Sequence, residues 1–240
     1  GGGALMAERL LIATGRKAAI AGLGLDKAVV ASSGRGIAIN RQCRTTNPRV
    51  WAAGDCCDNG GDMSSHYAGW QAFVATRSAL LPWFLRLGGD QPSIFTVVPR
   101  VIYTTPEVAS CGLSEGLVRR FYGPPGRRWH RVRVEWNAQD RAVAEMDHPG
   151  SFIEIFVHQT GRVLGGTIVS DRAGEMISEV AIAVNLRLLV KDLAMTLHPY
   201  PSYSFSVHKA WVEAATINLM SNLSSGPMGK LVSVCQKLMR

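Results

Sequence analysis

Long apolar runs are missing from this sequence of 240 residues. No uninterrupted apolar stretch reaches the roughly 18 residues that a helix needs to cross a bilayer. The opening "GGGALMAERLLIATG" does not combine a basic start, an apolar core and a small-residue cleavage site, so we expect no secretory signal. Internal repeats and low-complexity segments are also missing. We therefore expect neither a membrane-spanning protein nor a membrane partner.

Cysteine is scarce, and its few positions are scattered. The five cysteines are Cys43, Cys56, Cys57, Cys111 and Cys235. An odd number without metal-ligand spacing argues against a disulfide framework and predicts no metal site. A reducing intracellular compartment, cytoplasmic or organellar, is the expected location.

Acidic residues are outnumbered by 18 to 26, which gives a formal net charge of +8. The densest basic run is "RRFYGPPGRRWHRVRV" at residues 119–134. Such a run with interleaved aromatic residues can bind polyanions, or it can form a solvated loop and an edge strand whose arginines discourage pairing. No nucleic-acid-binding motif accompanies the run. We therefore expect the loop and edge strand, and no nucleic-acid partner.

Hydrophobic residues make up 47% of the chain, which is enough for a core and too many for wholesale disorder. Three short apolar runs between turns are typical of strands in part of an α/β domain. They are "RLLIAT" at 9–14, "GIAIN" at 36–40 and "RVWAAG" at 49–54. Residues 64–87 then show helical spacing, with one apolar face made of Tyr67, Trp70, Val74 and Leu81. The Gly/Pro-rich "LGGDQPS" at 87–93 marks the best domain boundary.

Beyond this boundary, alternating apolar and polar residues predict several strands. They are "FTVVPRVIYT" at 95–104, "HRVRVEW" at 130–136, "SFIEIFV" at 151–157 and "RVLGGTIVS" at 162–170. Two helices are expected at 172–188 and 204–222, the first with Ser170 or Asp171 as its N-cap. The expected faces are Ile177, Val180, Ala181 and Val184 in the first helix and His208, Trp211, Val212, Ala215 and Leu219 in the second. This proportion predicts an α+β layer with an antiparallel sheet.

The stretch "VWAAGDCCD" at residues 50–58 places Asp55 directly after an apolar run and a glycine. Ligands bind at such strand ends in α/β sheets, and a glycine lets the backbone turn close to them. A carboxylate accepts hydrogen bonds and suits a polyol or ribose hydroxyl. A helix beginning near Ser65 and His66 would direct its positive end to the same place, which favours an electron-accepting ring such as a flavin. Taken alone, a plain strand and turn explains this stretch at least as well.

Five motifs in order along the chain carry a more specific signal. They are "LLIATGR" at 10–16, "NPRVWAAGDC" at 47–56, "PRVIYTTPEVASCGLSE" at 99–115, "GTIVSDRAGEMISEVAIAV" at 166–184 and "LHPYPSYSF" at 197–205. Together they resemble the C-terminal half of the pyridine nucleotide-disulfide oxidoreductases, a family of flavoenzymes that includes glutathione reductase, dihydrolipoamide dehydrogenase and mercuric reductase. The resemblance implies the C-terminal part of a Rossmann-like FAD-binding domain at 1–90, an α+β dimerisation domain at 91–225 and a tail at 226–240.

The resemblance also implies FAD as cofactor, NAD(P)H as electron donor of the parent enzyme, and a homodimer. The implied FAD-contacting residues are Ala13, Thr14, Gly15, Gly54, Asp55, Ser65 and His66. In the family, the aspartate binds the ribityl hydroxyls, and the start of the following helix lies against the flavin pyrimidine.

Other family motifs lie upstream of anything in this sequence. They are two Gly-x-Gly-x-x-Gly segments, one for FAD and one for NAD(P)H, and a redox-active cysteine pair. We therefore expect a fragment of a longer chain or a truncated gene model, inactive by itself. The alternative is a catalytically inactive dimerisation or binding module derived from the family.

The catalytic end departs from the family pattern. Disulfide reductases carry a histidine here that a glutamate orients, whereas this sequence has Tyr200 and Phe205 at those positions. A phenol with a pKa near 10 is a poor base, and a phenyl ring cannot orient it. His198 matches a different family position. The tyrosine resembles the mercuric-reductase branch, but Cys235 is the one cysteine near the end of this sequence, which leaves a mercury-specific role unsupported.

The remaining candidates have structural interpretations. Cys56 and Cys57 follow the cofactor aspartate, and we expect them at the start of a loop, with a functional vicinal pair as the alternative. His208 and Cys111 are expected to pack in the core. Trp70 and Trp211 are expected to be interface or core anchors.

Overall fold

The computed structural model describes residues 4, 6–60, 63–85, 98–126, 128–135, 140–147 and 149–225. The chain divides into two compact units, Gly1–Gln91 and Pro92–Arg240. In the part of the chain that is described, no helix combines the length and the apolar character needed to span a membrane. The expected tail at 226–240 lies outside the described residues.

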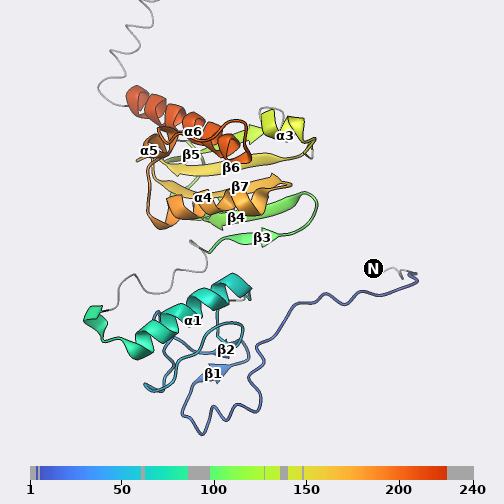
Figure 1. The fold of residues 1–240 in the computed structure, drawn as a ribbon, viewed down its shortest axis with the longest axis vertical. Coiled ribbons are helices and arrows are strands. Elements are labelled where there is room, and N and C mark those ends of the chain that lie inside the picture. Colours follow the sequence, from blue (N-terminus) through green and yellow to red (C-terminus); the bar gives the residue numbers. More distant parts are fainter. Residues whose placement is uncertain are drawn as a thin grey trace, which may run out of the picture. The chain divides into compact units, whose positions relative to one another are not determined.

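The first unit has little regular structure apart from one helix (Figure 1). Strands β1 (Ser32–Ser33) and β2 (Gly36–Ile37) form an antiparallel hairpin. Helix α1 spans Ser65–Leu80 and is followed by the short 3-10 helix η1 (Trp83–Leu85). Ile37 also bridges Cys57, which ties the hairpin to the segment that precedes α1.

The prediction of three strands in this unit is largely wrong. Residues 9–14 form no strand, and Leu11 is 88% exposed. Of residues 36–40 only β2 is a strand, and residues 49–54 contribute a single bridge between Arg44 and Trp51. A strand is stable when a neighbour pairs with its backbone, and among the described residues no neighbour pairs with 9–14. An apolar run alone therefore did not show whether its backbone forms a strand.

Helix α1 is confirmed, although it is shorter than the expected 64–87. Its buried face differs from the predicted one and includes two polar residues; it consists of Tyr67, Gln71, Val74, Ala75 and Ser78. Trp70, an expected anchor, is 40% exposed, and Leu81 lies beyond the end of the helix. Val74 and Ala75 pack with Cys43, Ile39 and Trp51 in a small core cluster.

The second unit is built on a five-stranded antiparallel sheet of order β3-β4-β7-β6-β5. The strands are β3 (Arg100–Ile102), β4 (Glu107–Gly112), β5 (Trp129–Glu135), β6 (Phe152–His158) and β7 (Val163–Ser170). Three of the expected strands are confirmed, and the first, expected at 95–104, is a strand only at Arg100–Ile102. Residues 95–97 and 136 of the expected strands lie outside the described ranges. The sequence pattern did not predict strand β4. Its residue Cys111 is buried, as expected.

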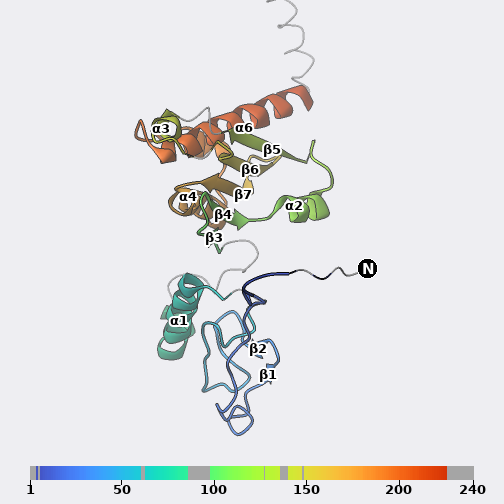
Figure 2. The same cartoon turned by 90° about the vertical axis from the view of Figure 1, so that its right-hand side faces the viewer.

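Two long helices lie along one face of this sheet (Figure 1). They are α4 (Ala173–Asn185) and α6 (Tyr203–Ser225). Because side chains alternate along a strand, Ile153, Ile155 and Val157 face these helices, whereas Phe156 joins a smaller cluster on the other side. That cluster includes Val118 of α2 (Glu115–Tyr122), and Figure 2 shows α2 and α4 on opposite sides of the sheet.

The predicted face of α4 is confirmed, and that of α6 is partly wrong. In α4, Ile177 and Val180 are buried, and Ala181 and Val184 pack partly buried against the same core. In α6, Trp211 is fully buried and His208 and Ala215 are partly buried, but Val212 and Leu219 are exposed. The other buried residues of α6 are Ser206, Val207, Ala210 and Ala214. Only one narrow row of side chains on this helix of 23 residues packs against the sheet. Which residues form that row depends on the strands beneath the helix.

The N-cap prediction for α4 is also wrong, because the N-cap residue is Arg172 and its side chain makes no capping bond. The carboxylate of Glu107, on β4, accepts a hydrogen bond of 2.8 Å from the backbone N–H of Gly174. A residue distant in sequence thus takes the place of a local cap.

The basic run at 119–134 forms the end of α2, a loop and strand β5, which lies at the edge of the sheet. The edge-strand prediction is therefore confirmed. Its arginines have nearby acidic partners: Arg131 lies 3.7 Å from Glu154 and 3.5 Å from Glu115. Arg133 lies 2.6 Å from Glu135 and 3.7 Å from Glu154.

Candidate functional site

The Gly54–Asp55 turn is held against α1 by a buried hydrogen-bond network. The backbone N–H of Gly54 donates to Gln71 Oε1 at 2.8 Å, and Asn59 Nδ2 donates to the Gly54 carbonyl at 2.9 Å. Gln71 Nε2 in turn donates to Asn59 Oδ1 at 2.8 Å. Gly54 has a positive φ of 82°, and a Cβ there would lie 3.2 Å from the Cβ of Ala68. The turn therefore requires glycine and has its position set by α1.

Asp55 projects from this turn with a side chain that is 48% exposed. Its Oδ2 lies 3.1 Å from Nη1 of Arg16, and Arg16 also donates to the Met63 carbonyl. These contacts bring the segment containing Ala13, Thr14 and Gly15 to the aspartate, although the two segments are about 40 residues apart. All three residues of that segment are exposed, and Gly15 has a positive φ of 103°.

The start of α1 completes the group. Ser65 and His66 are exposed in its first turn, and the Ser64 side chain makes no capping bond. That turn contains no acidic residue. The positive end of the helix is therefore not offset by a negative side chain of its own, which suits an acceptor-rich ligand.

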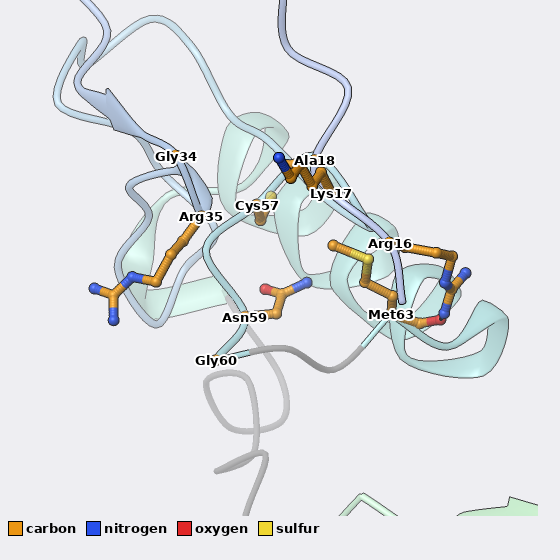
Figure 3. Close-up of a pocket in the computed structure, with 9 residues that line it drawn as sticks. All are labelled: Arg16, Lys17, Ala18, Gly34, Arg35, Cys57, Asn59, Gly60 and Met63. Atoms are coloured by element: carbon orange, nitrogen blue, oxygen red, sulfur yellow. Dashed lines mark hydrogen bonds between the residues drawn. The ribbon is translucent and has the colours of Figure 1, made fainter. Parts of the chain in front are cut away.

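A cavity of about 330 Å³ lies beside the turn (Figure 3). In Figure 3, Arg16 and Arg35 stand on opposite sides of it, with Asn59 between them. Lys17 adds a third basic residue, and the Cys57 side chain forms part of the wall. Arg35 Nη2 lies 3.1 Å from Asp58 Oδ2. The lining favours a ligand that carries negative charge.

Sequence reasoning missed the residues that support this site: Arg16, Asn59 and Gln71. Gln71 gave a usable signal, because it is a polar residue four positions after Tyr67 and three before Val74, on the buried side of a helix. A buried amide requires partners. Asn59 gave no comparable signal, because the turn between it and the glycine is irregular.

The second unit holds the other candidate positions. Tyr200 is 64% exposed, and its ring meets that of Phe205 edge-on at 5.2 Å between centroids. A hydrogen bond to the carboxylate of Asp140, with the repulsion of that charge, raises the pKa of the Tyr200 phenol above its ordinary value. Asp140 begins the short helix α3 (Asp140–Ala144) and was not foreseen. The phenol therefore stays protonated at neutral pH and is a poor general base.

His198 is not exposed like Tyr200 but takes part in a polar cluster behind it. Its Nε2 lies 3.0 Å from Glu179 Oε1, and its Nδ1 lies 2.8 Å from the Thr196 carbonyl. Trp211 donates to the same Glu179 oxygen. The His208 ring stacks at 4.9 Å from the His198 ring, and burial with the nearby His198 lowers the pKa of His208. His208 is thus a partly buried packing residue.

Both parts of the chain resemble known proteins. The family description "Pyridine nucleotide-disulphide oxidoreductase" matches residues 1–72, and its "dimerisation domain" matches residues 98–211. The two matches point to the same class of protein, the first over the N-terminal part of the chain and the second over the C-terminal part. The chain belongs to the pyridine nucleotide-disulphide oxidoreductase family.

Relatives of two activities resemble the chain to a similar degree. It is 34% identical over 209 residues to dihydrolipoyl dehydrogenase 3 of Pseudomonas aeruginosa, covering 86% of this chain and 41% of the relative. It is 33% identical over 209 residues to mercuric reductase of Acidithiobacillus ferrooxidans, covering 83% and 34%. The chain therefore spans roughly two fifths or less of these relatives' length.

Solved structures agree on the fold. LpdA from Mycobacterium tuberculosis matches with a TM-score of 0.71 and 29% identity, covering 81% of this chain and 40% of that structure. The HOCl-induced flavoprotein disulfide reductase RclA from Escherichia coli matches with a TM-score of 0.69 and 25% identity, covering 83% and 44%. The expected fold class, α/β plus α+β with an antiparallel sheet, is confirmed.

Proposed function

We propose that this chain supplies the flavin-contacting tail and the homodimerisation domain of an FAD-dependent NAD(P)H oxidoreductase. The observation that carries the proposal is the Gly54–Asp55 turn, which Gln71 and Asn59 fix against α1. It presents a half-exposed carboxylate beside the segment at 13–16 and the first turn of α1. These residues fit a flavin in their chemistry, since they combine a hydroxyl-binding carboxylate, exposed backbone and a positive helix end.

Each proposed contact has a stated role. Asp55 would accept hydrogen bonds from the ribityl hydroxyls, and Ala13, Thr14 and Gly15 would approach the cofactor through their backbone. Ser65 and His66 would lie at the pyrimidine side of the ring. Bound FAD would accept a hydride from NAD(P)H and pass electrons to a disulfide or another acceptor. Arg16 holds the Asp55 carboxylate in an exposed contact, which costs little to exchange for a ligand hydroxyl.

The proposed domain assignment is 1–90 for the nucleotide-binding portion, 91–225 for dimerisation and 226–240 for a tail. The proposed oligomer is a homodimer, in a reducing compartment of the cell. In this proposal Tyr200 takes the place of the family's histidine and Phe205 that of its glutamate; Tyr200 is exposed, and Phe205 lies edge-on beside it.

A second candidate is a catalytically inactive dimerisation or binding module. The observation that favours it is the same pair of residues, because a phenol with a raised pKa beside a phenyl ring cannot replace a histidine oriented by a glutamate. The parent enzyme would then reduce an acceptor that needs no such base, or the chain would serve assembly alone.

Two measurements separate the candidates. Light scattering during size-exclusion chromatography gives the oligomeric state, and an absorbance scan detects flavin. A yellow dimer excludes the inactive module. A colourless dimer shows that this piece does not retain flavin alone, and the coding sequence upstream then decides: Gly-x-Gly-x-x-Gly and Cys-x4-Cys in frame support the enzyme, and a transcript without them contradicts it.

The flavin contact is tested by titrating FAD fluorescence with the chain, extended upstream where those motifs are present. Asp55→Asn should weaken binding by about tenfold, because a neutral amide replaces a charged acceptor. Asp58→Asn is the matched control, since Asp58 lies nearby and pairs with Arg35 instead. Equal affinity of wild type and Asp55→Asn would remove Asp55 from the site.

A further inference from the structure

Two thiols beside the proposed flavin site have no part in the proposed function. The Sγ atoms of Cys56 and Cys57 lie 4.0 Å apart. Cys56 is partly exposed, and Cys57 is buried but lines the wall of the cavity in Figure 3. Neither of these two cysteines is in a disulfide within the described part of the chain, so the adjacent pair can bind a ligand through sulfur.

The backbone holds the two thiols in this arrangement. The Cys56 carbonyl accepts a hydrogen bond of 2.8 Å from the Ile37 N–H, and the Asp58 N–H donates to the Ile37 carbonyl at 3.0 Å. Cys57 N–H donates to the Gly54 carbonyl at 3.0 Å. Gly36 packs so closely that a Cβ there would lie 2.5 Å from the Cys57 carbonyl carbon. A disulfide between adjacent residues needs its sulfurs about 2.05 Å apart and a rearranged intervening peptide, which these contacts oppose.

The protonation of the pair restricts its chemistry. Burial, reinforced by the neighbouring Cys56 sulfur, raises the pKa of the Cys57 thiol well above its ordinary value. Cys57 is therefore a protonated thiol at neutral pH, whereas rapid alkylation and disulfide exchange need a thiolate. A suitable electrophile is one that takes the thiol protons on its own oxygen atoms.

The surroundings restrict the charge of the ligand. Arg16, Lys17 and Arg35 line the same cavity, and Asp55 and Asp58 pair with the two arginines, so the basic residues outnumber their acidic partners and disfavour a divalent metal cation. The described residues also contain no group of three or more His, Cys, Asp or Glu side chains placed to hold a metal ion. A neutral electrophile that binds two sulfurs is not repelled by the basic residues and needs no third protein ligand.

We propose that Cys56 and Cys57 form a bidentate dithiol site for trivalent arsenic in its neutral oxyacid or organic oxide form. Two As–S bonds form and two As–O bonds of the oxyacid break. The two thiol protons leave with the displaced hydroxyl groups as two molecules of water, arsenic stays trivalent and no oxidant is consumed. Two bonds of about 2.3 Å, the length typical of zinc–thiolate bonds, would hold their sulfurs about 3.3 Å apart at the near-right angle of pyramidal trivalent arsenic. The observed sulfur separation of 4.0 Å would therefore have to close by roughly 0.7 Å on binding.

Occupation of this site would act on the turn that carries Asp55. Cys57 is hydrogen-bonded to the Gly54 carbonyl, and Asp55 lies between these two residues. Drawing the sulfurs together would shift the turn and weaken flavin binding; this consequence alone depends on the proposed function. Arsenical binding itself is measurable on the chain without flavin.

The test uses phenylarsine oxide and intact-mass spectrometry on the whole chain. The expected product is a single phenylarsenic adduct with one water lost, stable to excess 2-mercaptoethanol and removed by 2,3-dimercaptopropanol. Cys56→Ala and Cys57→Ala should each lower the affinity by at least about tenfold. Cys43→Ala, Cys111→Ala and Cys235→Ala are the controls and should retain the adduct.

Folding is checked by the thermal melt of each variant, because Cys57 is buried whereas Cys56 is partly exposed. Cys56→Ala removes half of the chelate at the more exposed position, and it decides the result if Cys57→Ala fails to fold. Retention of the monothiol-resistant adduct in Cys56→Ala would overturn the proposal. Adducts that 2-mercaptoethanol removes from the wild-type chain would also overturn it.

Discussion

Glu179 Oε1 accepts hydrogen bonds from both His198 Nε2, at 3.0 Å, and Trp211 Nε1, at 2.5 Å. The other nitrogen of His198 faces the Thr196 carbonyl, which can only accept. Both ring nitrogens therefore face an oxygen acceptor. One carboxylate thus joins α4, the segment that carries Tyr200 and helix α6.

Glu179→Gln should lower the free energy of unfolding by about 1–3 kcal/mol, because it removes the charge that two buried donors share. Urea denaturation at neutral pH measures the change. Glu175→Gln, at an exposed position of the same helix, is the control and should change stability by less than about 0.5 kcal/mol. Equal effects of the two substitutions would show that the cluster adds nothing to an ordinary surface carboxylate.

The stability of the chain should fall as the pH falls below about 6.5, the ordinary pKa of histidine. Burial lowers the pKa of His130 and of His208 in the folded chain, so both bind protons more readily once the chain unfolds. Their stabilising contribution is complete above the unfolded pKa and is lost as the pH falls through the folded pKa. Denaturation at pH 7.5 and pH 5.5 measures this difference.

His130→Gln should reduce that pH dependence, because it removes a histidine whose pKa is lowered by burial. A pH dependence that persists undiminished in His130→Gln would assign the effect to other groups.

Gln71→Ala should destabilise the first unit by about 1–3 kcal/mol, because it leaves the Gly54 N–H and the Asn59 amide without their buried partner. The same variant should weaken flavin binding if the proposed function is correct, since the turn carrying Asp55 loses its attachment. Hydrogen exchange at the Gly54 amide reports the local effect directly. Thr76→Ala, at an exposed position on the same helix, should leave that exchange rate unchanged.

Two glycines near the start of α2 should respond to alanine in opposite directions. Gly112 has a φ of +81°, and a Cβ there would lie 2.5 Å from the Leu164 carbonyl oxygen, so Gly112→Ala should cost about 1–3 kcal/mol. Gly116 lies within helix α2 and has open space around it, so Gly116→Ala should stabilise by up to about 1 kcal/mol. Melting temperatures below the wild type for Gly112→Ala and above it for Gly116→Ala would agree with this geometry. A shift of both melting temperatures in the same direction would contradict it.

The sheet of the second unit was accessible from sequence because alternation along a strand reports which side is buried. Residues 151–157 and 162–170 alternate or run apolar strongly enough that β6 and β7 were found within about one residue of their ends. Strand β4 was missed because its residues are small and weakly patterned, and its place depends on pairing with β7 from Glu107 to Gly112. The five motifs were likewise recognisable in the sequence, and they indicated the family without any structural information.

The local sequence pattern predicted less of the secondary structure in the first unit. Its apolar residues at 9–14 are exposed and pair with no strand among the described residues. Residue identity pointed to Asp55, but the network of Gly54, Asn59 and Gln71 arises from contacts between segments that are far apart in sequence. The same holds for Glu107 at the start of α4 and for Glu179 under His198. Hydrogen bonds between distant segments leave no period in the sequence, so packing alone could assign their partners.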